Sequence, residues 1–337
     1  MSRSSALGLL VIALAATVAA ALRFGVEPID LLRAVREPES LDATILWSAR
    51  LPRVLLACLA GGALSVVGVS FQALLRNPLA DPYVLGVSGG AAAGATLAIV
   101  AGTSAFSVLG AAVVPAAAMA GGLLATLLVY AIARAGGEVS GTTIVLAGVI
   151  VNAIAASVIT FVKTLVSASK AQELLFWLMG FLDVPSTAQL VGCAIWVAVG
   201  LVPIALDAGR LNLLALGREP AGHLGVDVPR LERRVFFAAS AIAGAVVSLT
   251  GLIGFVGLVV PHAVRRLLGP DHRVVVPASL LLGATTLTAC DLLTRALFRW
   301  LQTEPPVGAV TALVGGPLFL VILLRGRRHA AGPGLAD

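Results

Sequence analysis

Long runs of apolar residues, separated by short polar segments, follow one another from near the first residue to about residue 325. A helix needs about 20 apolar residues to cross the hydrocarbon core of a bilayer. By that measure the pattern predicts ten spans, at residues 5–23, 54–75, 86–103, 107–134, 142–167, 188–207, 235–252, 254–268, 274–297 and 307–325. The segment 254–268 is short enough to be re-entrant. Glycines punctuate the stretch around 252–254, so this boundary is the least sharply defined.

The composition supports the same fold class. Hydrophobic residues make up 59% of the 337 positions and charged residues only 12%, whereas a soluble domain carries about a quarter charged residues. The chain is therefore expected to be an all-α, polytopic membrane protein. The first apolar run, residues 6–22 after Arg3, also fits a secretory signal. The many later spans favour a first transmembrane helix instead.

A charged, proline-containing segment at residues 76–82 lies between two apolar runs. Its asparagine, aspartate and two prolines do not suit a spanning helix. They do suit a loop held at the membrane surface, because proline fixes φ and removes a backbone donor that would need a partner. We therefore predict a turn between two membrane passes here.

Lysine and arginine set the expected orientation. With ten spans and the N-terminus inside, fourteen of the 23 basic residues fall in inside segments and nine in outside segments. The positive-inside rule then predicts that both termini lie in the cytoplasm. It also explains the net charge of +6 without nucleic-acid binding, since the basic residues are scattered at span ends.

The first outside loop, at about 24–53, carries surplus positive charge, and Arg50 and Arg53 stand where the next span begins. Two interpretations stay open from charge alone. The arginines could anchor phospholipid headgroups, or they could receive an acidic partner.

The longest inside loop, residues 208–234, alternates leucines with glycine and proline breakers. This pattern predicts two short amphipathic helices joined by a turn. Its mixed charges favour docking on a partner over packing against headgroups.

Several kinds of chemistry are not supported by any motif in the sequence. No Gly-x-x-x-x-Gly-Lys-Ser/Thr occurs, so ATP binding by a P-loop is excluded. Zinc-protease and lipase-type motifs are missing too. The cysteines lie in apolar runs without metal-ligand spacing, and the histidines lie in inside loops or at span ends. We predict neither a catalytic nor a metal site.

Few polar residues fall inside the predicted spans; those considered as candidates are Gln72, Asn152, Thr160, Thr250 and Asp291. Intramembrane ionisable groups are functional candidates by default. Asp291 stands four residues before Arg295, however, so an ion pair on one helix face is the simpler prediction. No carboxylate falls near a span's midplane, which argues against a proton-coupled carrier.

Read together, the motifs resemble a known family. They are Arg50-Leu-Pro-Arg53, Gln72, Arg76-Asn-Pro-Leu-Ala-Asp-Pro-Tyr-Val-Leu-Gly-Val-Ser-Gly-Gly90, and residues 146–148, 176–180, 211–217, 254–265, 269–273, 291–295 and 306–308. In this order and spacing the chain resembles the FecCD-type permeases, the membrane subunits of type II ABC importers that move ferric siderophores, haem and vitamin B12. The similarity covers about residues 45–325.

The resemblance implies one transmembrane permease domain over residues 1–337, in a bacterial inner membrane, working as a homodimer. Two cytoplasmic ATPase subunits would hold ATP and Mg, a periplasmic binding protein would deliver the substrate, and the chain itself would bind no cofactor. Within this resemblance, the residues at 83–90 and 176–180 slightly favour a corrinoid such as vitamin B12 as the substrate.

The resemblance also assigns roles to residues. Docking of the binding protein falls to Arg50, Arg53 and Arg295. The cytoplasmic gate comprises Asn77, Pro78, Leu79 and Ala80 with Ser140, Gly141, Thr142 and Thr143. Coupling to the ATPase, within 208–234, falls to Arg218, Glu219, Ala221, Leu224 and Gly225, although Arg218 and Pro220 depart from the acidic and helix-forming residues common there. The path would be lined by Asn152, Ser157 and Thr160.

A second hypothesis is a self-sufficient secondary carrier or channel whose arginine-rich outer face recruits an anionic substrate. It predicts uptake by the chain alone. The elaborate inside loop and the lack of a midplane carboxylate count against it. A membrane enzyme ranks third, because no nucleophile–base or metal constellation is visible.

Overall fold

The computed structural model describes residues 3–27, 29–102, 110–135 and 141–330, with side chains up to residue 321 except at 110 and 111. Over these ranges the chain is all-α and has no strand. The helices are α1 (Arg3–Arg23), α2 (Leu31–Arg36), α3 (Leu41–Ile45), η1 (Leu46–Arg50), α4 (Leu51–Leu74), η2 (Pro82–Leu85), α5 (Val87–Val100), α6 (Gly110–Ala135), α7 (Gly141–Thr164), α8 (Ala168–Met179), α9 (Thr187–Leu206), α10 (Ala208–Leu214), α11 (Arg218–His223), α12 (Val228–Thr250), α13 (Val256–Leu268), α14 (His272–Leu301) and α15 (Val307–Ala330).

Each of the ten predicted spans coincides with one helix: α1, α4, α5, α6, α7, α9, α12, α13, α14 and α15. Seven helical stretches of the described chain are long and apolar enough to cross a membrane, and α5 and α15 contribute shorter apolar helices. The chain is a multi-pass membrane protein. The predicted break near 252–254 is confirmed, because a non-helical segment separates α12 from α13. With 13 residues, α13 is shorter than a full span.

The predicted outside loop at 24–53 contains helices that the span count did not anticipate. Asp30 caps α2 by accepting from the Leu32 amide, and Ser40 caps α3 by accepting from the Ala43 amide. A π-helical turn, η1, then leads directly into α4. Amphipathic α8 was missed as well, because its 12 residues are too few for a span. Caps such as Asp30 and Ser40 were the available signal.

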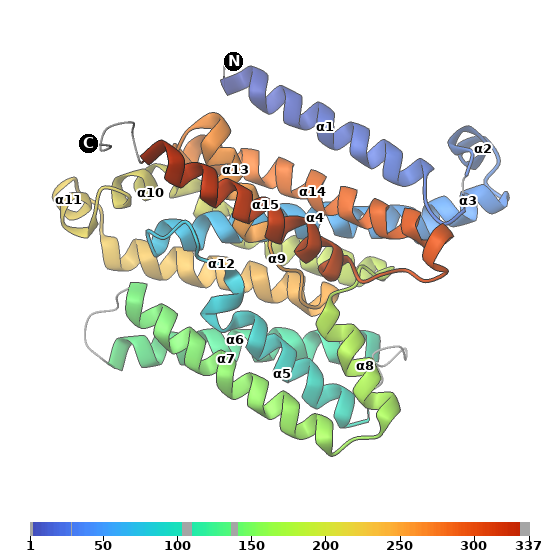
Figure 1. Cartoon of the computed structure of the whole chain (residues 1–337), viewed down its shortest axis with the longest axis horizontal. Helices are drawn as coiled ribbons and strands as arrows, with labels where there is room; N and C mark the ends of the chain where they lie inside the picture. The colour runs from blue at the N-terminus through green and yellow to red at the C-terminus, as the bar shows by residue number, and fades with distance from the viewer. Residues whose placement is uncertain (1–2, 28, 103–109, 136–140, 331–337) are drawn as a thin grey trace, which may run out of the picture.

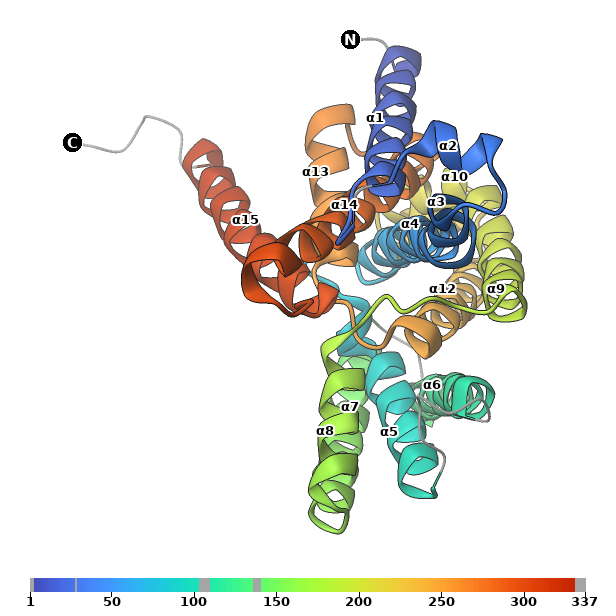
Figure 2. The ribbon, with the colours of Figure 1, turned by 90° about the vertical axis from the view of Figure 1, so that its right-hand side faces the viewer.

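The core lies around α4. In the most apolar part of the helical stretch that contains α4, 83% of the residues are buried. The corresponding share is 72% in α12 and 61% in α14, but only 11% in α1. Glycines let the neighbouring helices approach α4: Gly61 faces Gly283 of α14, and Gly68 faces Gly257 of α13. Small residues are typical of such close membrane-helix contacts. Helices α5, α6, α7 and α8 form a neighbouring group (Figures 1 and 2).

The long helices run between two ends of the molecule (Figure 1). We call the end that carries Arg50, Arg53 and Arg295 the arginine end, where α2 and α3 also lie. The opposite end carries α10 and α11, and we call it the α10–α11 end. Helix α14 connects the two: it begins beside α10 and ends at the arginine end.

Gly68 gives a direct test of this packing. A Cβ added there would lie 1.8 Å from the Gly257 carbonyl oxygen, so the backbone of α4 or α13 must move. We expect Gly68→Ala to lower stability by about 1–3 kcal/mol, the usual cost of overpacking. The measurement is the melting temperature in detergent, followed with a thiol-reactive dye on Cys58, Cys193 and Cys290. Gly8→Ala is the control, since nothing lies within 4 Å of that site; equal melting of the two variants would contradict the prediction.

Candidate functional site

The three arginines predicted to dock a partner are brought together at the arginine end. Arg50, Arg53 and Arg295 line one cleft of about 270 Å³, together with Glu27 and Gly25. Arg295 is 242 positions from Arg53 in the sequence. The structure thus brings side chains that are distant in the sequence to one surface. We call the three residues the arginine cluster.

Two members of the arginine cluster cap α1. The Arg50 guanidinium donates to the carbonyls of Leu22, Arg23 and Glu27. Arg295 donates to those of Ala21 and Phe24, at 3.0 and 3.2 Å. The last carbonyls of a helix lack intrahelical partners, and a cation near them is favoured by the helix dipole. Both arginines are buried, so their first role in this structure is to close the end of α1.

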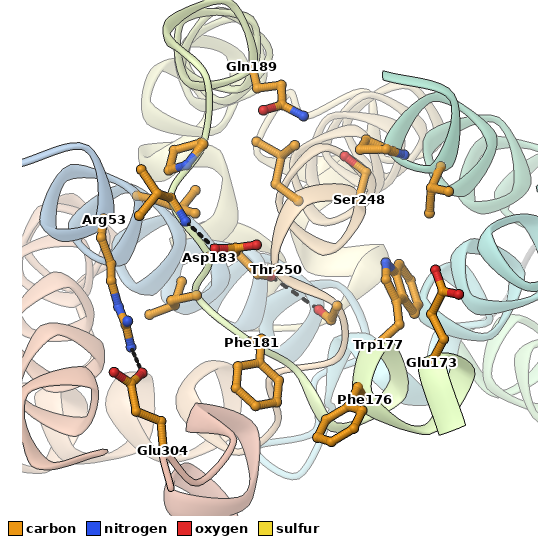
Figure 3. Close-up of a pocket in the computed structure, with 18 residues that line it drawn as sticks. Arg53, Glu173, Phe176, Trp177, Phe181, Asp183, Gln189, Ser248, Thr250 and Glu304 are labelled. Atoms are coloured by element: carbon orange, nitrogen blue, oxygen red, sulfur yellow. Dashed lines mark hydrogen bonds and ion pairs between the residues drawn. The ribbon is translucent and has the colours of Figure 1, made fainter. Parts of the chain in front are cut away.

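Arg53 joins two carboxylates. Its Nε lies 2.9 Å from Asp291 Oδ1. Its Nη2 lies 2.9 Å from Glu304 Oε2, the pair drawn in Figure 3. Asp291 Oδ2 in turn lies 3.0 Å from Arg295 Nε, so the predicted pair within α14 is confirmed. The sequence did not predict that Arg53 and Glu304 join the Asp291–Arg295 pair. No periodicity links α4 to the connection between α14 and α15.

These contacts limit how a partner could use the arginine cluster. Arg50 and Arg295 are only 6% and 4% exposed. The side chains of Arg53 and Glu304 are more accessible, at 16% and 27% exposed. An acidic partner would therefore meet Arg53 first and would replace Glu304 there. Docking by Arg50, Arg53 and Arg295 stays a prediction.

The predicted gate segments lie near the α10–α11 end. Asn77 Oδ1 accepts from the Leu79 amide and closes a tight turn; Asn77, Pro78 and Leu79 are exposed, whereas Ala80 is buried. Gly141, at the start of α7, packs against Leu75, so the two segments are neighbours. Thr142 is exposed and Thr143 half-buried. Ser140 lies outside the described residues.

Asp81 ends this turn and caps η2 by accepting from the Tyr83 amide at 2.8 Å. Burial raises the pKa of the Asp81 carboxyl from its usual 3.8 to about 6, against the lowering effect of the Tyr83 hydrogen bond. The folded loop thus binds a proton more tightly than the unfolded chain does.

A raised carboxyl pKa makes the loop most stable in acid. The stabilisation is complete below about pH 4 and is lost as pH rises through about 6. We expect amide exchange at residues 75–86, corrected for its intrinsic rate, to be slower at pH 5 than at pH 7. Asp81→Asn keeps the cap and removes the titration, so its exchange should not vary with pH. If exchange in Asp81→Asn follows the wild-type pH profile, this assignment is wrong. The control is Asp183→Asn at an exposed position, which should keep the wild-type profile at residues 75–86.

The predicted path residues do not share one surface. Ser157 and Thr160 are exposed on α7. Asn152 instead turns inward and donates to the Tyr83 carbonyl, which ties α7 to η2. The exposed face of α7 is otherwise apolar, with large side chains such as Leu146, Ile154 and Phe161. Lining of a path by Asn152, Ser157 and Thr160 stays a prediction.

The loop 208–234 forms the two short helices that were predicted, α10 and α11, joined by a turn at 215–217. Ala221 is buried and anchors α11, as Leu211 and Leu214 anchor α10. Arg218 pairs with Glu232 at 3.3 Å. The remaining coupling candidates, Glu219, Leu224 and Gly225, are exposed.

Helix α10 is fixed to the bundle by polar contacts. Asn212 Nδ2 donates to Asp271 Oδ1, and Asn212 Oδ1 accepts from the His272 amide, each at 2.8 Å. Asp207, whose side chain is 1% exposed, pairs with Arg210 and Arg234 at 2.7 and 2.6 Å. Any force on α10 would therefore be passed to the start of α14.

Among the described residues, no group of three or more His, Cys, Asp and Glu side chains is placed to hold a metal ion. The polar groups at the two ends are arranged for ion pairing and helix capping.

Comparisons with known proteins agree with this architecture. The model of a family described as the FecCD transport family matches residues 9–325. The cobalamin import system permease protein of Halobacterium salinarum is 41% identical over 311 residues, which are 92% of this chain and 78% of that protein. The hemin transport system permease protein of Yersinia pestis is 37% identical over 288 residues, 85% of each.

A solved structure is also similar. It is described as an inward-facing conformation of a metal-chelate type ABC transporter, and it is 29% identical. The TM-score is 0.82, with 96% of this chain and 99% of that chain covered.

Proposed function

The chain belongs to the FecCD transport family, and we propose that it is the membrane permease of an ATP-driven importer of bulky metal chelates. Two cytoplasmic ATPase subunits would hydrolyse ATP with Mg, and a periplasmic binding protein would deliver the substrate. The permease would lie in the cytoplasmic membrane with both termini and the α10–α11 end inside. The arginine end would face outward.

The observation that carries this proposal is the course of α14. Its first residues meet α10 through Asn212, and its last turns supply Asp291 and Arg295 to the arginine cluster. At 1.5 Å per residue, its 30 residues span about 45 Å. One helix would thus join the surface proposed for an outer partner to the element proposed for an inner one.

This arrangement supports a mechanism in which both partners bias a two-state permease. Closure of the ATPase pair would move α10 and α11, and the anchors at Asp207 and Asn212 would transmit that movement to α12 and α14. The gate turn lies close by, because a Cβ added at Gly217 in the α10–α11 turn would lie 3.9 Å from the Arg76 guanidinium. This proximity supports a coupling in which movement of the α10–α11 turn would reach the gate turn directly.

The surface supports a second copy of the chain as partner. Large apolar side chains are exposed along α7 and α15, among them Phe161, Leu313 and Leu320. Some of this surface would face lipid. We propose that the rest forms a homodimer enclosing the path.

For the substrate we favour vitamin B12. A cobalamin permease is 41% identical to this chain and a hemin permease is 37% identical. This small difference favours the same substrate as the motifs at residues 83–90 and 176–180. The cargo is a choice among vitamin B12, haem and ferric siderophores.

The test is ATP hydrolysis and uptake in proteoliposomes that contain the permease, its ATPase and its binding protein. Each of the three chelates is loaded in turn. Stimulation by one chelate alone identifies the cargo. Uptake by the isolated chain under an ion gradient would refute the proposal and favour a secondary carrier.

A further inference from the structure

The guanidinium of Arg53 is already occupied by carboxylates of its own chain. Its Nη2 lies 2.9 Å from Glu304 Oε2 (Figure 3), and its Nε lies 2.9 Å from Asp291 Oδ1. The Asp291 side chain is fully buried, whereas that of Glu304 is 27% exposed. Of the two carboxylates, therefore, Glu304 is the one that an incoming carboxylate can replace.

Arg53 stands between two adjoining cavities. One is the cleft of about 270 Å³ that also holds Arg50 and Arg295, and the other has a volume of about 480 Å³. Arg53 lines both of them, but Glu304 lines the larger one alone. The geometry thus leaves space on both sides of the guanidinium, so that one carboxylate can enter through the cleft while the other withdraws into the larger cavity.

The charges of this group favour an exchange of like for like. Arg53 and Arg295 carry two positive charges, and Asp291 and Glu304 carry two negative ones. A carboxylate in the place of Glu304 keeps this balance and makes a strong, charge-assisted hydrogen bond. A neutral or basic group would leave the Arg53 guanidinium short of a partner, which is costly for a largely buried charge.

Glu304 belongs to the connection from α14 to α15, and two prolines follow it directly. Pro305 and Pro306 have a fixed φ and no N–H, so this stretch has little freedom and few backbone donors of its own. Helix α15 begins immediately afterwards, where the Gly308 amide donates to the Gly180 carbonyl at 3.2 Å. A movement of Glu304 is therefore passed to the start of α15.

We propose that Glu304 is an internal occupant of the docking site, that a carboxylate of the binding protein displaces it from Arg53, and that this displacement releases the start of α15; this rests on the proposed function. Helix α15 exposes large apolar side chains, among them Leu313 and Leu320, at the surface proposed for the second copy. Docking at the arginine end would thus act on a helix beside the path, by a route separate from α14.

The contact inside the permease is tested first, with the full-length chain in lipid nanodiscs and no partner. Glu304→Gln keeps the shape of the side chain and removes its charge. We expect amide exchange at residues 302–310, corrected for its intrinsic rate, to be about two- to fivefold faster than in wild type, the range that a partly exposed ion pair contributes.

Glu37→Gln is the matched control. Glu37 also pairs with an arginine, Arg33, at 2.9 Å and at the same end of the molecule, but both side chains lie in and next to α2. This variant removes one negative charge and one ion pair without touching α15, so exchange at residues 302–310 should stay at the wild-type rate. If Glu304→Gln and Glu37→Gln give the same exchange there, the inference is overturned.

A second measurement separates this inference from the proposed function. The affinity of the binding protein for the reconstituted permease–ATPase complex is compared among wild type, Glu304→Gln and Glu37→Gln. We expect Glu304→Gln alone to bind about two- to fivefold more tightly, because the internal competitor is gone. The binding protein should also speed exchange at residues 302–310 in wild type and have no further effect in Glu304→Gln.

The outcomes are distinguishable. If the wild type binds and Glu304→Gln binds no more tightly than Glu37→Gln, the inference fails and the proposed function stands. The inference also fails if binding leaves exchange at residues 302–310 unchanged in wild type. If no binding protein engages the wild type, the proposed function fails and the inference falls with it.

Discussion

Asp291→Asn is expected to be the most destabilising single substitution at the arginine end, with a loss of about 3–5 kcal/mol, the usual cost of removing one partner of a buried ion pair. Asp291 is fully buried between two guanidiniums, with Arg53 on one oxygen and Arg295 on the other. Asparagine keeps the shape and removes the negative charge. Two nearly buried cations would then face each other with no anion between them.

The effect should be seen as a marked fall in melting temperature in detergent, or as failure of the folded protein to accumulate. Glu304→Gln is the matched control: it removes the other carboxylate of Arg53, but Glu304 is 27% exposed, and a solvent-screened pair contributes about 0–1 kcal/mol. Adding Arg295→Gln to Asp291→Asn should cost less than the two losses combined, because it removes one of the stranded cations. Melting of Asp291→Asn within a degree of wild type would refute this account.

The arginine cluster shows which contacts could be predicted from the sequence and which could not. The ten spans follow from apolar run lengths, and the Asp291–Arg295 pair follows from its spacing of four residues. Arg53 joins that pair from α4, and Arg50 turns back to the carbonyls of α1. Contacts between helices distant in the chain leave no periodic signal, so these partners required the structure.

Local sequence signals explain why α10 and α11 were predicted and why Asn152 was assigned to the path. Gly217 and Gly225, with φ of 123° and 84°, mark the breaks that identified α10 and α11. By contrast, Asn152 looked like a path residue because it is polar within a span. Its side-chain amide instead donates to the partly buried carbonyl of Tyr83, and a backbone carbonyl removed from water needs such a donor. A polar residue in an apolar helix is an equally good sign of such a bond, and the sequence alone does not distinguish the two.

Asn212→Ala is expected to uncouple the two ends of the permease. In a complex with the ATPase and the loaded binding protein, stimulation of ATP hydrolysis should fall by about 5–150-fold, the usual range of coupling between sites. Hydrolysis without binding protein should stay within about twofold of wild type. The reason is geometric: Asn212 is the residue of α10 that bonds to both Asp271 and His272, where α14 begins.

Arg3→Ala provides the control at the same joint. Arg3 also contacts Asp271, at 3.1 Å, but its side chain is 67% exposed, so losing this pair costs about 0–1 kcal/mol and leaves α10 attached to α14. Stimulation in Arg3→Ala should therefore match wild type. If Asn212→Ala keeps full stimulation, or if Arg3→Ala loses as much, α14 does not carry the signal between the ends. The connection through Asp207, Arg234 and α12 would then be the one to break next, because it is the other polar joint between α10 and the bundle.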